Sequence, residues 1–144
     1  MKSLIVWICA LMLLGGASAQ KRIIQDPHAQ VRSVTGFHAI EVSSAVDRLW
    51  KERTDKPLVN IGGTPFVAGI AALGQKTRPN VMIGVDLNHS PWLNEADIRS
   101  RGIAFIFDHD EGVPALCGSA AFKSTITLKD PLMPQLTAII CPPL

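Results

Sequence analysis

Three short apolar runs, each preceded by a segment with helical character, constrain the fold of this chain more than any other feature. The runs lie at Leu58–Gly62, Val81–Asp86 and Ile103–Asp108, and nearly every residue in them is apolar until a final glycine or aspartate. Strands that are apolar on both sides are typical of a parallel sheet covered on each face by helices. The pattern predicts an α/β fold, a small three-layer sandwich with a mostly parallel central sheet.

The segments between these runs have the marks of helices. From Glu41 onward, apolar residues recur with helical spacing at Val42, Ala45, Val46, Leu49 and Trp50. The segment Phe66–Leu73 is apolar nearly all round, so we expect it to be buried against the sheet. Asn94 can cap a helix that runs through Arg101, whose acidic first turn and basic last turn suit the helix dipole.

Two further strands and a polar lead segment complete the predicted organisation. Alternation in Lys123–Lys129 and an apolar run at Leu136–Cys141 predict two strands that pair antiparallel at the edge of the sheet. Residues 20–40 show no helical period, and we interpret them as a lead segment with a short edge strand at Gln30–Val34. The predicted organisation is a signal peptide at 1–19, the lead segment at 20–40 and a single α/β domain at 41–144.

The N-terminus has the three zones of a secretory signal peptide. Lys2 supplies the positive end, an apolar run extends from Leu4 to Leu14, and the small residues Ala17-Ser18-Ala19 follow. A bilayer-spanning helix needs about 20 apolar residues, and this run is roughly half as long. We therefore expect cleavage near Ala19 and a periplasmic or secreted protein.

Cleavage would leave about 125 of the 144 residues, which is the size of one domain. Without Lys2 the 14 basic residues become 13, against 12 acidic ones, so the balance gives no reason to expect a nucleic-acid partner. Tyrosine is absent and aromatic residues are few, which argues against a carbohydrate-binding face paved with stacked rings. Cys117 and Cys141 remain, and in an oxidising compartment they are a candidate disulfide.

Polar residues gather where the predicted strands end. The turn Gly62-Gly63-Thr64 leads from a strand into a helix, where free N–H groups and the helix dipole favour an anion such as phosphate. The spacing of these glycines matches neither the G-x-G-x-x-G fingerprint nor the P-loop. A tight turn that needs small residues explains the same glycines.

A second group follows the next two strands. Ligands of open α/β sheets bind beyond the carboxyl ends of the strands, which makes candidates of Asp86, His89, Asp108 and His109 together with Asp110. These side chains could hold a divalent metal, although their spacing matches no zinc signature, or they could be solvated acids that cap turns. Trp92 fits either a plug under the loop or a platform on which a sugar stacks. The sequence predicts no cofactor.

Most of the chain resembles a known family. The run AVDRLWKERTDKPLVNIGG, the helix FVAGIAAL and the segment TRPNVMIGVDLNHSPWLNEADIRSRGIAFIFD are similar to the soluble C-terminal periplasmic domain of bacterial family-39 membrane glycosyltransferases, of the protein mannosyltransferase and aminoarabinose transferase type. The resemblance covers residues 45–144 and is most specific from Ser90 to Phe107. Residues 25–47 separately resemble the start of secreted adhesins with a β-solenoid head.

The resemblance implies binding rather than catalysis. In that family the catalytic acid lies between membrane helices, and this sequence has no counterpart of that body, so no catalytic residue is carried over. The expected function is an exported, non-catalytic accessory domain that binds a glycan, a lipid head group or a membrane protein. Two alternatives stay open: a small metal-dependent or phosphate-handling hydrolase, and a truncated adhesin-like surface protein.

Overall fold

The computed structural model of the chain describes residues 27–129 and 135–144. The chain divides into two compact units, residues 1–33 and residues 34–144, and the fold described below is that of the second. The predicted signal peptide lies outside the described residues. Within the described ranges, no helix is both long enough and apolar enough to cross a membrane.

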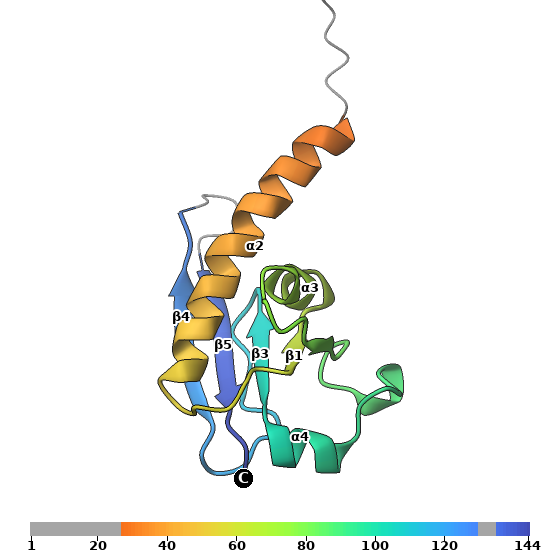
Figure 1. The fold of residues 1–144 in the computed structure, drawn as a ribbon, viewed down its shortest axis with the longest axis vertical. Helices are drawn as coiled ribbons and strands as arrows, with labels where there is room; N and C mark the ends of the chain where they lie inside the picture. Colours follow the sequence, from red (N-terminus) through yellow and green to blue (C-terminus); the bar gives the residue numbers. More distant parts are fainter. Residues whose placement is uncertain (1–26, 130–134) are drawn as a thin grey trace, which may run out of the picture. The chain divides into compact units, whose positions relative to one another are not determined.

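A mixed five-stranded sheet forms the centre of this unit (Figure 1). Its strands lie in the order β2-β1-β3-β5-β4. The bounds of the elements, in chain order, are α2 Pro27–Lys51, β1 Asn60–Gly63, α3 Pro65–Leu73, β2 Asn80–Val81, the 3-10 turn η1 Leu87–His89, α4 Glu95–Arg101, β3 Ile103–Phe107, β4 Phe122–Thr127 and β5 Gln135–Cys141.

The α/β class is correct, but the expectation of a mostly parallel sheet is wrong. β1 is parallel to β2 and β3, through two and three residue pairs. The antiparallel pairs are longer, with five between β3 and β5 and six between β4 and β5. β5 is inserted beside β3, and its residues Leu136–Cys141 are all buried, which explains why that run is continuously apolar.

The second predicted strand is much shorter than the apolar run that suggested it. Only Asn80–Val81 pair with β1 as a ladder. The chain then turns at Gly84, whose φ of 65° lies in the left-handed region, and forms an isolated antiparallel bridge with Gly63. The backbone N–H of Ile83 donates to Ser90 Oγ at 2.9 Å, which closes the loop that follows β2.

The lead segment is helical where the structure describes it. The short strand expected at Gln30–Val34 is wrong, because these residues lie within α2. A helix that is already nucleated extends at little cost, since each added residue contributes one further hydrogen bond. The packed part of α2 from Val42 to Trp50 can therefore support helix in the more polar residues before it.

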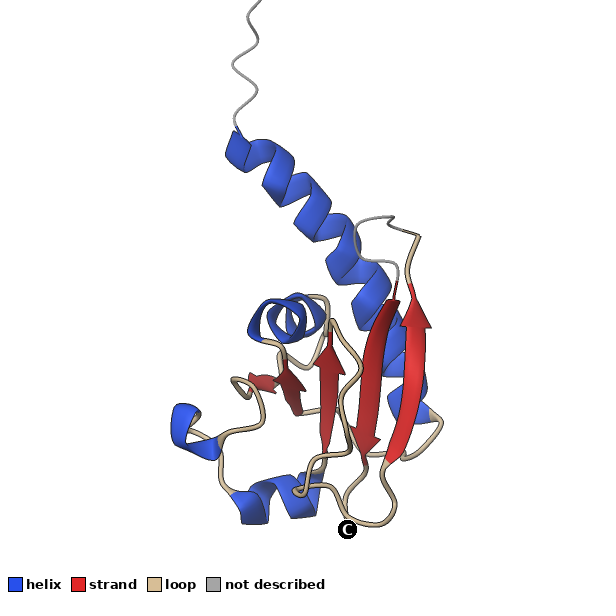
Figure 2. Ribbon diagram, turned by 180° about the vertical axis from the view of Figure 1, so that it is seen from behind, coloured by secondary structure: helices blue, strands red, loops and turns tan. Residues whose placement is uncertain are grey.

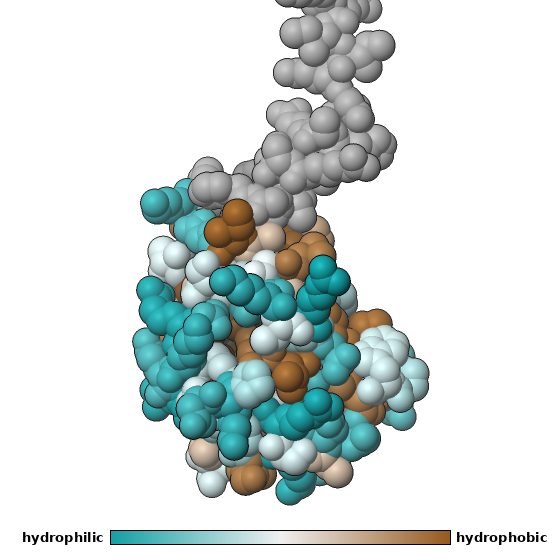
Figure 3. Space-filling model, in the orientation of Figure 1, coloured by the Kyte–Doolittle hydropathy of each residue, from teal (hydrophilic) through white to brown (hydrophobic). Residues whose placement is uncertain are grey.

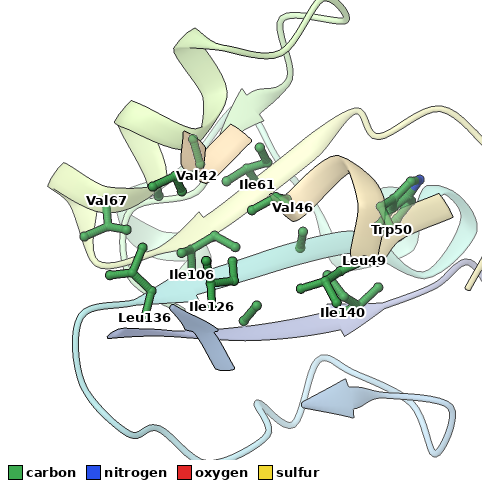
Figure 4. Close-up of a cluster of buried hydrophobic side chains, with 14 of the residues drawn as sticks. Val42, Val46, Leu49, Trp50, Ile61, Val67, Ile106, Ile126, Leu136 and Ile140 are labelled. Atoms are coloured by element: carbon green, nitrogen blue, oxygen red, sulfur yellow. The ribbon is translucent and has the colours of Figure 1, made fainter. Parts of the chain in front are cut away.

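The two faces of the sheet are packed differently, and Figure 2 shows the face away from α2, with α4 at the end where β3 begins. On one face, α2 and α3 pack on the sheet through the cluster that Figure 4 shows. On the other face, Ile98 of α4 and the loop residues Met82 and Leu93 form a second cluster. Alternate residues of β3 serve the two clusters, with Ala104 and Ile106 facing the first and Ile103, Phe105 and Phe107 facing the second.

The chain reaches β2 and β3 by two crossover connections that move in opposite directions across the sheet, from strand to strand. The first passes from β1 through α3 to β2, and the second from β2 through α4 to β3 on the far side of β1. Because α3 and α4 lie on opposite faces, the two crossovers have the same hand. The carboxyl ends of β1 and β3 are adjacent, and the chain leaves them in different directions.

Helix α3 is less buried than its composition predicted. Val67, Ala68, Ile70 and Ala71 are buried, but Phe66 is 62 % exposed and Leu73 is 77 % exposed. The sheet and α2 contact one side of this nine-residue helix, and its other side faces outward. Apolar composition on every side of a short helix was therefore not sufficient to predict burial on every side.

Cys117 and Cys141 form a disulfide, with their Cα atoms 5.1 Å apart. Cys141 ends β5 and belongs to the second core cluster, and Cys117 and Leu116 pack against that cluster from the loop after β3. The bond therefore fixes the middle of this loop to the sheet.

The double variant Cys117→Ser, Cys141→Ser should lower the free energy of unfolding by about 3 kcal/mol, because the bond closes a loop with a sequence separation of 24 residues. Urea denaturation followed by circular dichroism measures the change. Wild-type protein in dithiothreitol is the matched control and should unfold at the same midpoint as the variant. A reduced wild type that keeps its oxidised midpoint would show that the bond adds nothing to stability.

Two phenylalanines provide a second test of the fold. Phe105 is fully buried in the second cluster, so Phe105→Ala should cost about 3–5 kcal/mol of unfolding free energy. Phe66 is 62 % exposed, and Phe66→Ala should change it by no more than about 0.5 kcal/mol. The comparison uses the same urea assay, and equal losses in the two variants would contradict the placement of α3.

Candidate functional site

The glycine pair at the end of β1 is required by close packing. A side chain at Gly62 would run into the ring of Phe105, and one at Gly63 would overlap the backbone of Ile106. Gly63 also has a φ of 119°, a conformation that other residues rarely adopt. Both glycines are thus explained by the neighbouring strand, without a ligand.

Two backbone donors of the turn after β1 are already paired. The N–H of Gly63 donates to Gly84 O and that of Thr64 to Ile106 O, both at 3.0 Å. Thr64 occupies the N-cap position of α3 without a capping hydrogen bond from its side chain, and its hydroxyl donates instead to Asp108 Oδ1 at 2.9 Å. A carboxylate of the protein thus lies where an anionic ligand would meet the helix dipole, which argues against a phosphate site at Gly62-Gly63-Thr64.

Asp108 and His109 form a small polar cluster with Glu111 beyond the end of β3. His109 Nδ1 lies 2.8 Å from Asp108 Oδ1, and its Nε2 lies 3.0 Å from Glu111 Oε2. The hydrogen bonds to Asp108 and then to Glu111 raise the pKa of His109 above its ordinary value of 6.5. The hydrogen bonds from His109 and then from Thr64 lower the pKa of Asp108 below 3.8.

Asp86 and His89 pair with each other instead. Asp86 Oδ1 accepts the N–H of Asn88 at 2.8 Å and caps η1, while its Oδ2 lies 3.3 Å from His89 Nδ1. Within residues 27–129 and 135–144, no group of three or more histidine, cysteine or acidic side chains is arranged to hold a metal ion. Asp110 forms an ion pair with Lys123 at 2.6 Å. The residues that sequence reasoning gathered at one edge thus form separate local pairs.

Trp92 does not plug the core. Its side chain is 55 % exposed, and its Nε1–H donates to the carbonyl of Val81 at 3.0 Å. The interpretation of Trp92 as a buried plug under the loop is therefore wrong. The hydrogen bond fixes the orientation of the ring, and the exposed face keeps the alternative of a stacking platform open.

A groove of about 500 Å³ lies at the opposite end of the strands, where β1 and β2 begin. Three segments line it: the C-terminal part of α2, the loop from α2 to β1, and the loop from α3 to β2. The lining residues are Ser43, Ser44, Asp47, Trp50, Lys51, Asp55, Lys56, Pro57, Leu58, Gly74, Gln75, Lys76 and Thr77. Sequence reasoning missed this groove, because no motif connects the three segments.

Hydrogen bonds between the segments hold the walls of the groove in place. Gln75 Nε2 donates to the carbonyl of Ser43 at 2.9 Å and joins the α3–β2 loop to α2. The indole of Trp50 donates to Lys56 O at 2.7 Å, and Thr77 Oγ1 donates to Leu58 O at 2.7 Å. Ser43 and Gln75 are buried, with exposed fractions of 4 % and 8 %. The groove is therefore built by contacts within the unit and does not need a ligand to form.

The groove presents charges of both signs. Lys51, Lys56 and Lys76 line it together with Asp47 and Asp55, which leaves an excess of one positive charge. Lys51 Nζ lies 2.7 Å from Asp47 Oδ2, so one pair is internally balanced. Hydrophilic residues also predominate on the face that contains α2 (Figure 3). Such a lining offers a ligand many hydrogen-bond donors and acceptors and only a small net electrostatic field.

Comparison of the chain with protein-family models, with characterised proteins and with solved structures finds no match.

Proposed function

We propose that this chain is an exported, non-catalytic accessory domain that binds a hydroxyl-rich polar ligand, a glycan or the sugar head group of a lipid, in the groove between α2 and the α3–β2 loop. The observation that carries the proposal is the preformed groove of about 500 Å³ with its mixed polar lining. Ligand pockets of proteins commonly measure about 300–1,000 Å³.

The lining suits hydroxyl groups because each sugar hydroxyl both donates and accepts hydrogen bonds. The carboxylates of Asp47 and Asp55 are acceptors, and the ammonium groups of Lys56 and Lys76 are donors. The near balance of charge favours a neutral or singly charged ligand over a polyanion such as nucleic acid. Trp50 is only 1 % exposed, so recognition would depend on hydrogen bonds and not on stacking.

The resemblance of residues 45–144 to the periplasmic domain of family-39 glycosyltransferases supports the same proposal. Chemistry in that family takes place in the membrane-embedded part, and the resembling domain lies outside it. A ligand of this domain would then be a glycan or a lipid-linked sugar that is bound without being transformed. The predicted signal peptide supports export to the compartment where such ligands occur.

Export has a direct test. We expect the mature protein, expressed in a Gram-negative host, to begin near Gln20, because signal peptidase cleaves after small residues such as Ala19. Mass spectrometry of the periplasmic fraction measures the N-terminus. Protein that keeps Met1 and stays in the cytoplasm would refute export.

Binding is tested by following amide chemical shifts while methyl glucoside or glucose 1-phosphate is added. Shifts should cluster at residues 43–58 and 74–77, which line the groove. Lys76→Ala and Asp55→Ala should each weaken binding about tenfold or more, since each removes one hydrogen bond to a charged group. Lys129→Ala is the control, because Lys129 is exposed and does not line the groove.

The two probes separate the possible ligands. A stronger response to glucose 1-phosphate would indicate a phosphorylated head group, and equal responses would indicate a neutral glycan. Shifts centred on residues 62–66, 86–92 and 108–111 would move the site to the other edge of the sheet. The absence of shifts with both probes would refute the groove as a sugar site.

A further inference from the structure

The imidazole of His109 lies between two carboxylates that belong to the same loop. Its two ring nitrogens are 2.8 Å from Asp108 Oδ1 and 3.0 Å from Glu111 Oε2. An ionised carboxylate only accepts hydrogen bonds, and a neutral imidazole carries a single N–H. Both contacts can therefore exist together only when His109 is protonated.

We propose that His109 is a pH-sensitive latch: in its protonated form it holds Asp108 and Glu111 together at the start of the β3–β4 loop, and it releases Glu111 when it loses its proton. Asp108 connects this part of the loop to α3, because it accepts a hydrogen bond from the hydroxyl of Thr64, the N-cap residue, at 2.9 Å. The latch does not depend on the ligand of the groove, which lies at the opposite edge of the sheet.

The geometry of the loop limits what can move. One end is held by Asp108 and Thr64, and the other by the disulfide from Cys117 to Cys141. Between them, Gly112 has open space where a side chain would be, and Val113 is 50 % exposed. Loss of the contact to Glu111 would therefore free residues 111–113 without disturbing the core, while Asp110 keeps its ion pair with Lys123.

The charged groups around His109 favour its protonated form. Asp108 and Glu111 contact it directly, and Asp110 lies between them in sequence and pairs with Lys123 of β4 at 2.6 Å. The ring of Phe107 lies 5.7 Å away and is tilted by 57°. These neighbours bring three carboxylates and one ammonium group.

The direction of the pH dependence follows from the pKa values. Hydrogen bonds to Asp108 and Glu111 raise the pKa of His109, so the contribution of the latch is complete below about 6.5 and is lost as pH rises through the raised value. The pKa of Asp108 is lowered, so this carboxylate stays ionised until the pH falls below its ordinary value of 3.8. The latch is thus closed in mildly acidic solution and opens on the alkaline side.

The test is a titration of the full chain followed by NMR of the histidine ring protons and of the backbone amides. The midpoint of His109 should lie above 6.5, and the amide shifts of residues 110–112 should follow the same midpoint. Glu111→Gln should lower that midpoint and remove the pH dependence of those amides. Glu95→Gln is the matched control, because it removes the same charge from an exposed residue that pairs with Arg99.

Three results would overturn the proposal. The first is a midpoint of His109 at or below 6.5 in the wild type. The second is an equal effect of Glu111→Gln and Glu95→Gln, which would indicate a general effect of net charge. The third is an unchanged set of amide shifts at residues 110–112 while His109 titrates.

Discussion

The burial of β3 on both faces and along both edges is the constraint on which the rest of this unit depends. All five residues of the strand are buried, and β1 and β5 occupy its two sides. The close approach of β1 requires glycine at position 63, where any side chain would overlap the backbone of Ile106. The polar Asn60, fully buried at the start of β1, is satisfied by donating to the carbonyl of Gly102 at 3.1 Å. The apolar and polar contacts thus specify the same register.

The sequence predicted those parts of the fold that depend on local signals. The helix from Asn94 appeared as expected, with Asn94 Oδ1 accepting the N–H of Asp97 at 2.8 Å and Gly102 ending the helix. The neighbours of β5 were predicted only in part. Its antiparallel pairing with the strand before it is confirmed, but its place between β4 and β3 was not foreseen, because both strands were expected at the edge of the sheet. The strand on its other side is set by contacts with residues far away in the sequence.

The candidate sites also differ in whether local sequence signals or long-range contacts determine them. The contact between Thr64 and Asp108 was within reach of sequence reasoning, because both residues follow predicted parallel strands, whose carboxyl ends lie on the same side of the sheet. The groove was out of reach, because its shape depends on how the ends of α2 and α3 meet two loops. Gly74 illustrates this: it lies against Ser43 of α2 so closely that a side chain would not fit, and nothing around it in the sequence predicts that partner.

The two edges of the sheet differ in what they can offer a ligand. At the carboxyl edge, Thr64, Asp108, His109 and Glu111 bind one another, so a ligand would have to replace hydrogen bonds that already exist. Such an exchange contributes little free energy, because each new contact is offset by a lost one. At the groove, the buried Gln75 and Trp50 are satisfied by backbone carbonyls and hold the walls, while charged groups such as Asp55 and Lys76 line the space between them. In a preorganised binding site, the groups that hold the walls are separate from the groups that face the ligand. For this reason we propose binding at the groove and the pH response at the carboxyl ends of the strands.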